Sequence, residues 1–290
     1  MSYRYLSVSD RPTLRRPVLL VGFTGWGDAG AGASGAVKYL LGDPSPAACA
    51  VLDPEACFDF SVERPITKRG RDGRWRLTYP RIRFQAVIRE DAAHDLLIMR
   101  GPEPHKNWPT LAREAASFAA ELGVELAITL GAFIGAVSHR RTPLMRRTPN
   151  RELDQRLADL GLDDTSYSGP TAFVTAMLHA LDDAGVPAAS IWAAGPPYLG
   201  SPNPSLSLAL LRGTQDVVDE PLGLDRLEKM SEEFVKKVEE ALRENPEVAG
   251  KLGKLVDLTE QAAPDEPPDL PSGADLVNDL EQFLRENRGE

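Results

Sequence analysis

A glycine-rich segment, residues 18–41, constrains the fold more than any other part of the chain. It begins with a short, continuous apolar run, residues 18–23, which is typical of a strand covered on both faces in a parallel sheet. A loop punctuated by glycine follows, and then a helix whose apolar residues Val37 and Leu40 can pack on the sheet. This strand, loop and helix predict an α/β protein.

Three glycines in this segment, Gly30, Gly32 and Gly35, are expected inside the helix, although glycine there costs about 1 kcal/mol relative to alanine. So many glycines indicate that the first turns press closely on another backbone or on a ligand. We expect Asp28 to cap the N-terminus of this helix.

The stretch from Gly25 to Gly30 also fits the dinucleotide-binding pattern G-x-G-x-x-G, and Asp53 ends the next expected strand, where a ribose-binding acid would lie. Two residues argue against that interpretation. The Asp28 carboxylate would occupy the positive helix end that a pyrophosphate needs, and Trp26 is bulky for a phosphate turn. Close packing or another polar ligand is therefore the favoured explanation, with a nucleotide site as the alternative.

Composition describes an ordinary globular protein of 290 residues, with 42% hydrophobic and 26% charged residues. No apolar run reaches transmembrane length, and the first residues lack a secretory apolar region, so we expect a cytoplasmic protein without a membrane partner. The two cysteines, Cys49 and Cys57, form no metal-type pair and no disulfide framework. A net charge of −10 argues against general binding of nucleic acid.

The alternation of apolar runs with helical patterns predicts βαβ units and a mainly parallel sheet. After the first strand and helix, further strands are expected at residues 48–52, 95–99, 126–132 and 191–194, and helices at residues 109–122, 151–160, 170–184 and 205–211.

Residues 58–89 differ from this pattern, because apolar and polar residues alternate and Asp72-Gly73 gives a hairpin signal. We expect an antiparallel excursion here. Its basic side chains could contact an acidic partner or the protein's own acidic tail, and a solvated, self-repelling face is the alternative. These basic residues are Arg64, Lys68, Arg69, Arg71, Arg74, Arg76, Arg81 and Arg83.

The last quarter of the chain is acidic and helical, so we divide the protein into an α/β core, residues 1–220, and an appendage, residues 221–290. A helix is expected at residues 224–260, with its apolar face formed by Leu227, Met230, Phe234, Val238 and Leu242. A linker rich in proline and acid covers residues 263–273. A second helix, residues 274–287, is too short to be stable without a surface to dock on.

Candidate site residues follow four of the expected strands, at the edge where ligands bind in open α/β sheets. Gly25, Trp26 and Asp28 follow the first strand, and Glu103 and His105 follow residues 95–99. A histidine near carboxylates could perform acid–base chemistry, and an arginine could hold an anion. The other candidates are His139, Arg140 and Tyr198, and Ser138, Asp53 and Glu55 lie close to the same edge. No metal-ligand spacing and no nucleophile motif accompanies them, so we expect no metal and no cofactor.

Several segments, taken in order, resemble the proteasome assembly chaperone family of the second-chaperone type, most closely its prokaryotic branch. They are GFTGWGDAGAGASGAVKYL, FDFSVERP, GPEP, GAFIGAVSHRRTP, YSGPTAF and IWAAGPPYLGSPNPS. The resemblance covers about residues 15–220 and implies a three-layer α/β fold similar to nucleoside phosphorylases and peptidyl-type hydrolases. It also implies self-association, for example as a trimer, together with a role in assembling 20S proteasome rings. Relatives that dock into proteasome α-ring pockets end in hydrophobic–tyrosine–any residue. This chain ends Arg288-Gly289-Glu290 and does not match that docking motif.

Three functions are consistent with these observations, and the third is an interaction scaffold whose partner is unrelated to proteasomes. The first is an oligomeric, chaperone-like protein that binds partner subunits, including proteasome subunits, without catalysis. The second is a small-ligand-binding protein, or a hydrolase- or phosphorylase-like enzyme, that uses the edge of the sheet. In that case His139 and Asp28 are the acid–base candidates, and Arg140 holds an anion.

Overall fold

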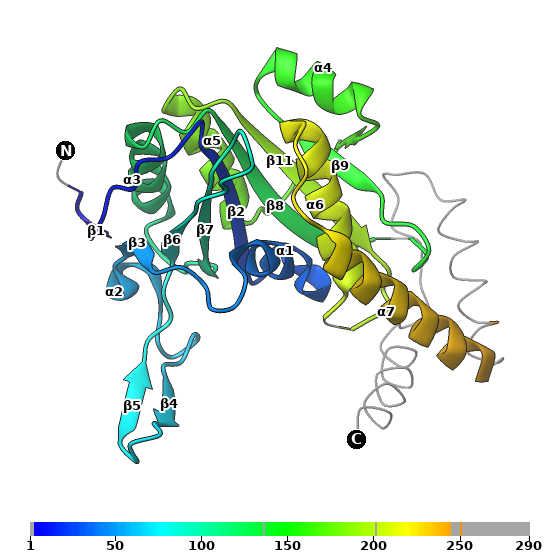
Figure 1. The fold of residues 1–290 in the computed structure, drawn as a ribbon, viewed down its shortest axis with the longest axis horizontal. Helices are drawn as coiled ribbons and strands as arrows, with labels where there is room; N and C mark the ends of the chain where they lie inside the picture. The colour runs from blue at the N-terminus through cyan, green and yellow to red at the C-terminus, as the bar shows by residue number, and fades with distance from the viewer. Residues whose placement is uncertain (1–2, 136, 201, 245–249, 251–290) are drawn as a thin grey trace.

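A computed structural model describes residues 3–135, 137–200, 202–244 and 250 of the chain. Within these residues, nine strands form one sheet with the order β1-β3-β6-β7-β2-β8-β11-β9-β10 (Figure 1). In sheet order the strands are Leu6–Val8, Ala48–Leu52, Arg83–Val87, Leu96–Pro102, Val18–Thr24, Leu126–Ile134, Ala188–Gly195, Leu144–Arg147 and Asp163–Asp164. The helices are α1 (Gly32–Leu41), α2 (Pro54–Cys57), α3 (Trp108–Glu121), α4 (Arg151–Asp159), α5 (Phe173–Asp183), α6 (Pro204–Val218) and α7 (Asp225–Glu244).

The centre of the sheet is parallel, because β2 pairs in parallel with both β7 and β8, and β8 pairs in parallel with β11. Antiparallel strands flank this centre, with β6 beside β7 and β9 beside β11. The predicted α/β fold is therefore confirmed. The sequence did not indicate β9, which lies between the expected strand at 126–132 and the helix α4, or β10, which directly follows α4.

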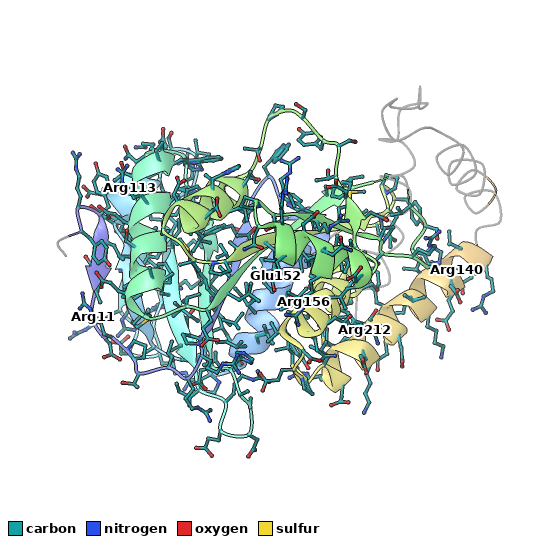
Figure 2. The ribbon with its side chains drawn as sticks, turned by 90° about the horizontal axis from the view of Figure 1, so that it is seen from above. Arg11, Arg113, Arg140, Glu152, Arg156 and Arg212 are labelled. Carbon is teal, nitrogen blue, oxygen red and sulfur yellow. The ribbon has the colours of Figure 1, made fainter. Side chains whose placement is uncertain are left out.

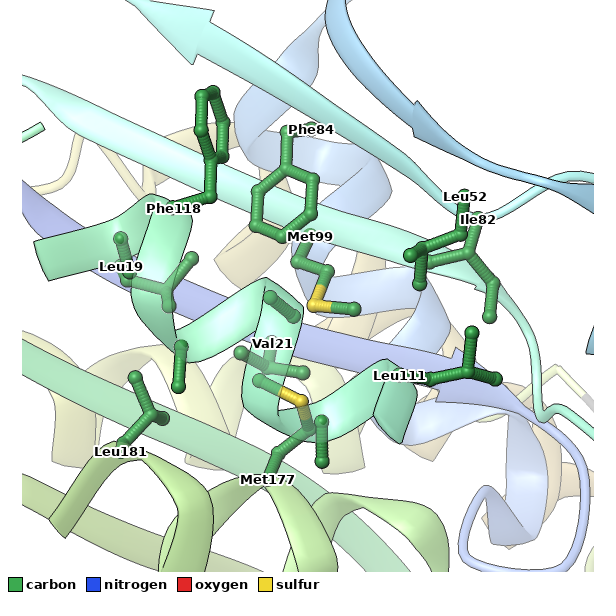
Figure 3. Close-up of a cluster of buried hydrophobic side chains, with 14 of the residues drawn as sticks. Leu19, Val21, Leu52, Ile82, Phe84, Met99, Leu111, Phe118, Met177 and Leu181 are labelled. Carbon is green, nitrogen blue, oxygen red and sulfur yellow. The ribbon is translucent and has the colours of Figure 1, made fainter. Parts of the chain in front are cut away.

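Helices cover both faces of the sheet and form the three expected layers. Because side chains alternate along β2, Leu19 and Val21 face one buried cluster while Val18 and Leu20 face the other. The first cluster lies under α3 and α5, and Figure 3 shows Phe84, Met99, Phe118 and Met177 within it. The second cluster lies under α1 and α6. Each fully buried side chain of this kind contributes about 2 kcal/mol.

The N-terminus of α1 packs directly on α6, which explains part of the glycine pattern. A Cβ atom on Gly32 would lie 2.9 Å from Leu206 Cβ and 3.0 Å from Ala132 Cβ. Close packing is therefore confirmed at this position. Gly30 differs from the prediction: it lies in a short 3-10 turn, Ala29–Ala31, before α1, with a φ of 58°.

The antiparallel excursion is confirmed and contains a separate hairpin of β4 (Ile66–Arg69) and β5 (Trp75–Thr78). This hairpin projects from the body of the protein (Figure 1, cyan), and all eight of its strand residues are exposed. The turn contains Asp72 and Gly73, and Gly73 has the positive φ of 76° that such a turn requires. β6, in contrast, returns to the main sheet.

Helix α7 packs on α6 and buries Leu227 and Val238. The predicted apolar face is wrong at Met230, which is 44% exposed, because Ser231 and Ala241 take part in the buried face instead. The division of the chain at residue 220 stays a prediction. The linker at 263–273 and the helix at 274–287 lie outside the described residues. In the described part of the chain, no helix is long and apolar enough to cross a membrane.

Candidate functional site

The carboxyl ends of four parallel strands, β7, β2, β8 and β11, meet at one edge of the sheet, as the sequence predicts. We call this edge the rim. The candidate residues lie on the loops that leave these strands, and each makes contacts that determine what it can do.

Glu103 connects two loops of the rim. Its Oε1 atom accepts a hydrogen bond from the backbone N–H of Phe173 at 2.6 Å, and its Oε2 atom accepts one from the N–H of Trp26 at 3.3 Å. Phe173 is the first residue of α5, so the carboxylate lies at the positive end of that helix. Gly25, with a φ of 139°, allows this approach, because a Cβ there would lie 2.8 Å from Glu103 Cβ. The carboxylate therefore holds the rim together, while the Trp26 side chain is 62% exposed.

Asp28 points toward the start of α1. Its Oδ1 atom accepts a hydrogen bond from the backbone N–H of Ser34 at 3.0 Å, which supports the predicted capping role, although Ala31 is the residue that precedes the helix. Burial raises the pKa of Asp28, and the hydrogen bonds from Ser34 and Ala33 oppose that effect.

His105 lies over α2. Its Nδ1 atom accepts a hydrogen bond from the backbone N–H of Asp59 at 3.0 Å, and its ring meets the edge of Phe58 at a centroid distance of 5.9 Å. Asp53, at the N-terminus of α2, accepts a hydrogen bond from the N–H of Glu55. These contacts hold His105 and Asp53 in place beside α2.

His139 and Tyr198 form the second group at the rim. The Tyr198 hydroxyl oxygen accepts a hydrogen bond from the backbone N–H of His139 at 2.8 Å and lies 2.8 Å from its Nδ1 atom. When the hydroxyl donates its proton to Nδ1, the neutral imidazole carries its own proton on Nε2; in the other tautomer Nδ1 donates to the hydroxyl oxygen and Nε2 is an acceptor. Nε2 is buried and has no partner among the described residues. Burial lowers the pKa of His139, and the nearby Arg140 lowers it further. Burial raises the pKa of Tyr198.

Arg140 joins the rim to α7. Its guanidinium lies 3.2 Å from the carboxylate of Glu239, and Figure 2 shows Arg140 beside the C-terminal half of the helix. The Arg140 side chain is 71% exposed, so this ion pair is a weak contact.

The rim candidates thus form two separate groups, one around Glu103 and one around Tyr198. Among the described residues, no hydrogen bond or ion pair joins His139 to Asp28 or to Glu103. The same part of the chain contains no group of three His, Cys, Asp or Glu side chains arranged to hold a metal ion. The proposed ligand-binding residues therefore stay a prediction.

Two hollows lie away from the middle of the rim, and the sequence did not indicate either of them. One, of about 630 Å³, is lined by His139, Arg140 and residues of α6 and α7. The other, of about 1350 Å³, is an open groove that lies between α1, α7 and the base of the hairpin. Arg83 and Arg100 line it together. Their meeting depends on the pairing of β6 with β7, and sequence spacing does not reveal that pairing.

Comparison with known proteins adds to this geometry. The sequence profile of the PAC2 family matches residues 22–242. A PAC2 family protein from Streptomyces avermitilis is 36% identical, with a TM-score of 0.71, over 77% of this chain and 95% of that protein. A proteasome-assembly chaperone homologue from Mycobacterium tuberculosis is 31% identical, with a TM-score of 0.70, over 77% of this chain and 94% of that protein.

An archaeal proteasome activator from Pyrococcus furiosus shares the fold at 15% identity, with a TM-score of 0.63, over 81% of this chain and 98% of that protein. No curated protein matches this chain by sequence.

Proposed function

The chain belongs to the PAC2 family, and from that premise we propose that it is a proteasome-assembly-chaperone-like protein. In this proposal it is a cytoplasmic homo-oligomer that binds partner protein subunits, including proteasome subunits, and does so without catalysis. A similar protein from Mycobacterium tuberculosis is described as a proteasome-assembly chaperone homologue, which supports the choice of partner.

The hairpin β4–β5 is the observation that carries the proposal. A two-stranded hairpin is marginally stable alone, yet this one extends into solvent with large apolar side chains on it. Trp75 and Leu77 are 69% and 56% exposed, and they lie on the same face because they are two residues apart on one strand. Arg69 is paired with Trp75 and shares this face. Tryptophan and arginine are the residues that most often dominate protein interfaces. We infer that this face contacts the partner subunit.

Affinity capture from the cytosol of the source organism tests the proposal. The tagged full-length protein is compared with the double variant Trp75→Ala, Leu77→Ala. The affinity for proteasome subunits, measured from their recovery, should fall about thirtyfold in the variant, since the loss of an interface aromatic such as Trp75 costs about 2 kcal/mol. The control is Ile88→Ala, Leu160→Ala, which removes two apolar residues that are also exposed, at 56% and 40%, away from the hairpin. If no proteasome subunit is recovered by the unaltered protein, the proposal fails.

One observation favours the second function, a small-ligand site. The buried Nε2 of His139 has no partner among the described residues, and a hollow of about 630 Å³ adjoins it. A buried ring nitrogen without a hydrogen-bond partner is unusual, and a ligand that pairs with it would explain it. In the enzyme form of this proposal, His139 and Asp28 would act as acid and base, with Arg140 as the anion contact.

Thermal unfolding in the presence of a panel of metabolites tests this second function. A ligand that raises the melting temperature of the unaltered protein, but not of His139→Ala, supports it. Absence of any shift across nucleosides, phosphates and carboxylates contradicts it. Tyr167→Phe is the matched control, because Tyr167 is 52% exposed and does not line the hollow.

A further inference from the structure

Two arginines face each other in the open groove of about 1350 Å³. Arg83 of β6 lies directly opposite Arg100 of β7 in the antiparallel register, and both side chains are half-buried. They share a face of the sheet with Leu96 and Ile98 of β7, which belong to the cluster under α1. The groove therefore exposes the part of that face that carries the arginine pair.

This pair lacks a counter-charge in the part of the chain that the structure describes. None of the ion pairs there includes Arg83 or Arg100. Burial lowers the pKa of Arg83, and the adjacent guanidinium groups of Arg100 and Arg81 lower it further. Like charges opposite each other on paired strands are destabilising, so a carboxylate between them would relieve the repulsion.

The Arg100 side chain is held in place. Its Nε atom donates a hydrogen bond to Oε1 of Gln85 at 2.8 Å, and the buried Gln85 side chain in turn donates to the carbonyl oxygen of Pro46. This contact leaves the two terminal nitrogens of the guanidinium free to hold a carboxylate with two parallel hydrogen bonds.

The rest of the groove favours a peptide over a small anion. Eight basic and three acidic residues line it, a surplus of five positive charges, and apolar groups such as Tyr79, Met230 and Phe234 lie among them. A volume of about 1350 Å³ exceeds the roughly 300–1000 Å³ of a typical small-molecule site. The groove therefore suits a segment that carries both acidic and apolar side chains.

This chain contains such a segment. Residues 257–290 carry ten acidic and two basic residues, together with apolar residues such as Leu276, Leu280 and Phe283. The segment follows α7 in the chain, and α7 itself forms one wall of the groove. We propose that residues 257–290 dock in the groove of their own chain, with their carboxylates paired to Arg83 and Arg100.

Zero-length cross-linking of the full-length protein tests this proposal. A carbodiimide joins a lysine amine to a carboxylate only when the two are in contact, and Lys38 is an exposed lysine that lines the groove. We expect mass spectrometry to find Lys38 joined to acidic residues between 257 and 290. In the variant Arg83→Gln, Arg100→Gln this product should fall about tenfold, since charge-assisted contacts are lost.

A matched control removes the same charge elsewhere. Arg71→Gln, Arg74→Gln alters two exposed arginines of the hairpin turn that do not line the groove, and it should leave the Lys38 product unchanged. Circular dichroism verifies that each variant is folded. A Lys38 product that is absent from the unaltered protein, or equal in both variants, overturns the proposal.

A mixture of ¹⁵N-labelled and unlabelled protein shows which chain supplies the cross-linked carboxylate. Products that join a labelled to an unlabelled chain would show that a second copy fills the groove, and they would overturn the proposal.

Discussion

The Glu103 carboxylate accepts a hydrogen bond from the backbone N–H of Phe173, 70 residues later in the chain, at 2.6 Å. The same carboxylate holds the N–H of Trp26, so one side chain ties the loop after β2 to the start of α5.

Replacement of Glu103 by alanine should lower the free energy of unfolding by about 2 kcal/mol, because it leaves a helix N-terminus without its acceptor. Glu103→Gln should lose less, since the amide oxygen still accepts one hydrogen bond. Urea unfolding measures both. Glu125→Ala is the control: Glu125 pairs with Arg16 on the exposed surface, and its loss should change stability by less than about 1 kcal/mol. Equal effects at the two positions would contradict this role.

Gly32→Ala should destabilise the protein by about 1–3 kcal/mol, because the new Cβ would press on Leu206 and Ala132. In most helices, replacing glycine by alanine instead stabilises the protein by about 1 kcal/mol. Gly250→Ala is the control, since a Cβ there meets open space. Thermal unfolding of the two variants provides the measurement. A Gly32→Ala protein as stable as the parent would show that α1 and α6 are not in close contact.

Asp95 makes the free energy of unfolding depend on pH in the acidic range. Burial raises the pKa of this carboxyl, but hydrogen bonds from Arg15 and from the N–H of Arg89 outweigh that effect and lower it to about 2. A lowered pKa in the folded state stabilises the protein above the unfolded pKa of about 4. That stabilisation should be lost as the pH falls from about 4 to about 2. The free energy of unfolding of Asp95→Asn should depend less strongly on pH across this interval. A dependence equal to that of the unaltered protein would contradict the role assigned to Asp95.

His139 should titrate below its ordinary pKa of about 6.5, because burial and Arg140 disfavour its charged form. Since the unfolded chain then binds the proton more readily, this group lowers stability as the pH falls through about 6.5. NMR titration of the imidazole resonances gives the pKa directly. Arg140→Gln should move it upward, toward the ordinary value. A His139 pKa at or above about 6.5 in the unaltered protein would refute the assigned environment.

Much of the fold could be predicted from local pattern. The continuous apolar run at residues 18–23 became the central strand β2, and Pro109 marked the start of α3, which begins at Trp108. The hairpin was predictable because Asp72-Gly73 is a turn signal. These features depend on residues close together in the chain.

The features that sequence reasoning missed depend on distant contacts. The prediction ended α6 near Leu211, whereas the helix continues to Val218. Gly213 lies inside the helix and leaves room for the Leu144 side chain, since a Cβ atom at this position would lie 2.7 Å from Leu144 Cδ1. The strand β9 that supplies Leu144 is four residues long and half-buried, so its pattern is weak. In the candidate site, the four strand ends were predictable from local sequence. The division into a Glu103 group and a Tyr198 group was not, because it depends on contacts between distant segments.

The most direct test of the central claim is the assembly of proteasomes from purified components. The full-length protein is mixed with the α and β proteasome subunits of its own organism, and native mass spectrometry follows complexes over time. The account predicts a complex between this protein and proteasome subunits that forms before the complete particle and is lost in Trp75→Ala, Leu77→Ala. Assembly that proceeds at the same rate with and without the protein, with no such complex, would contradict it.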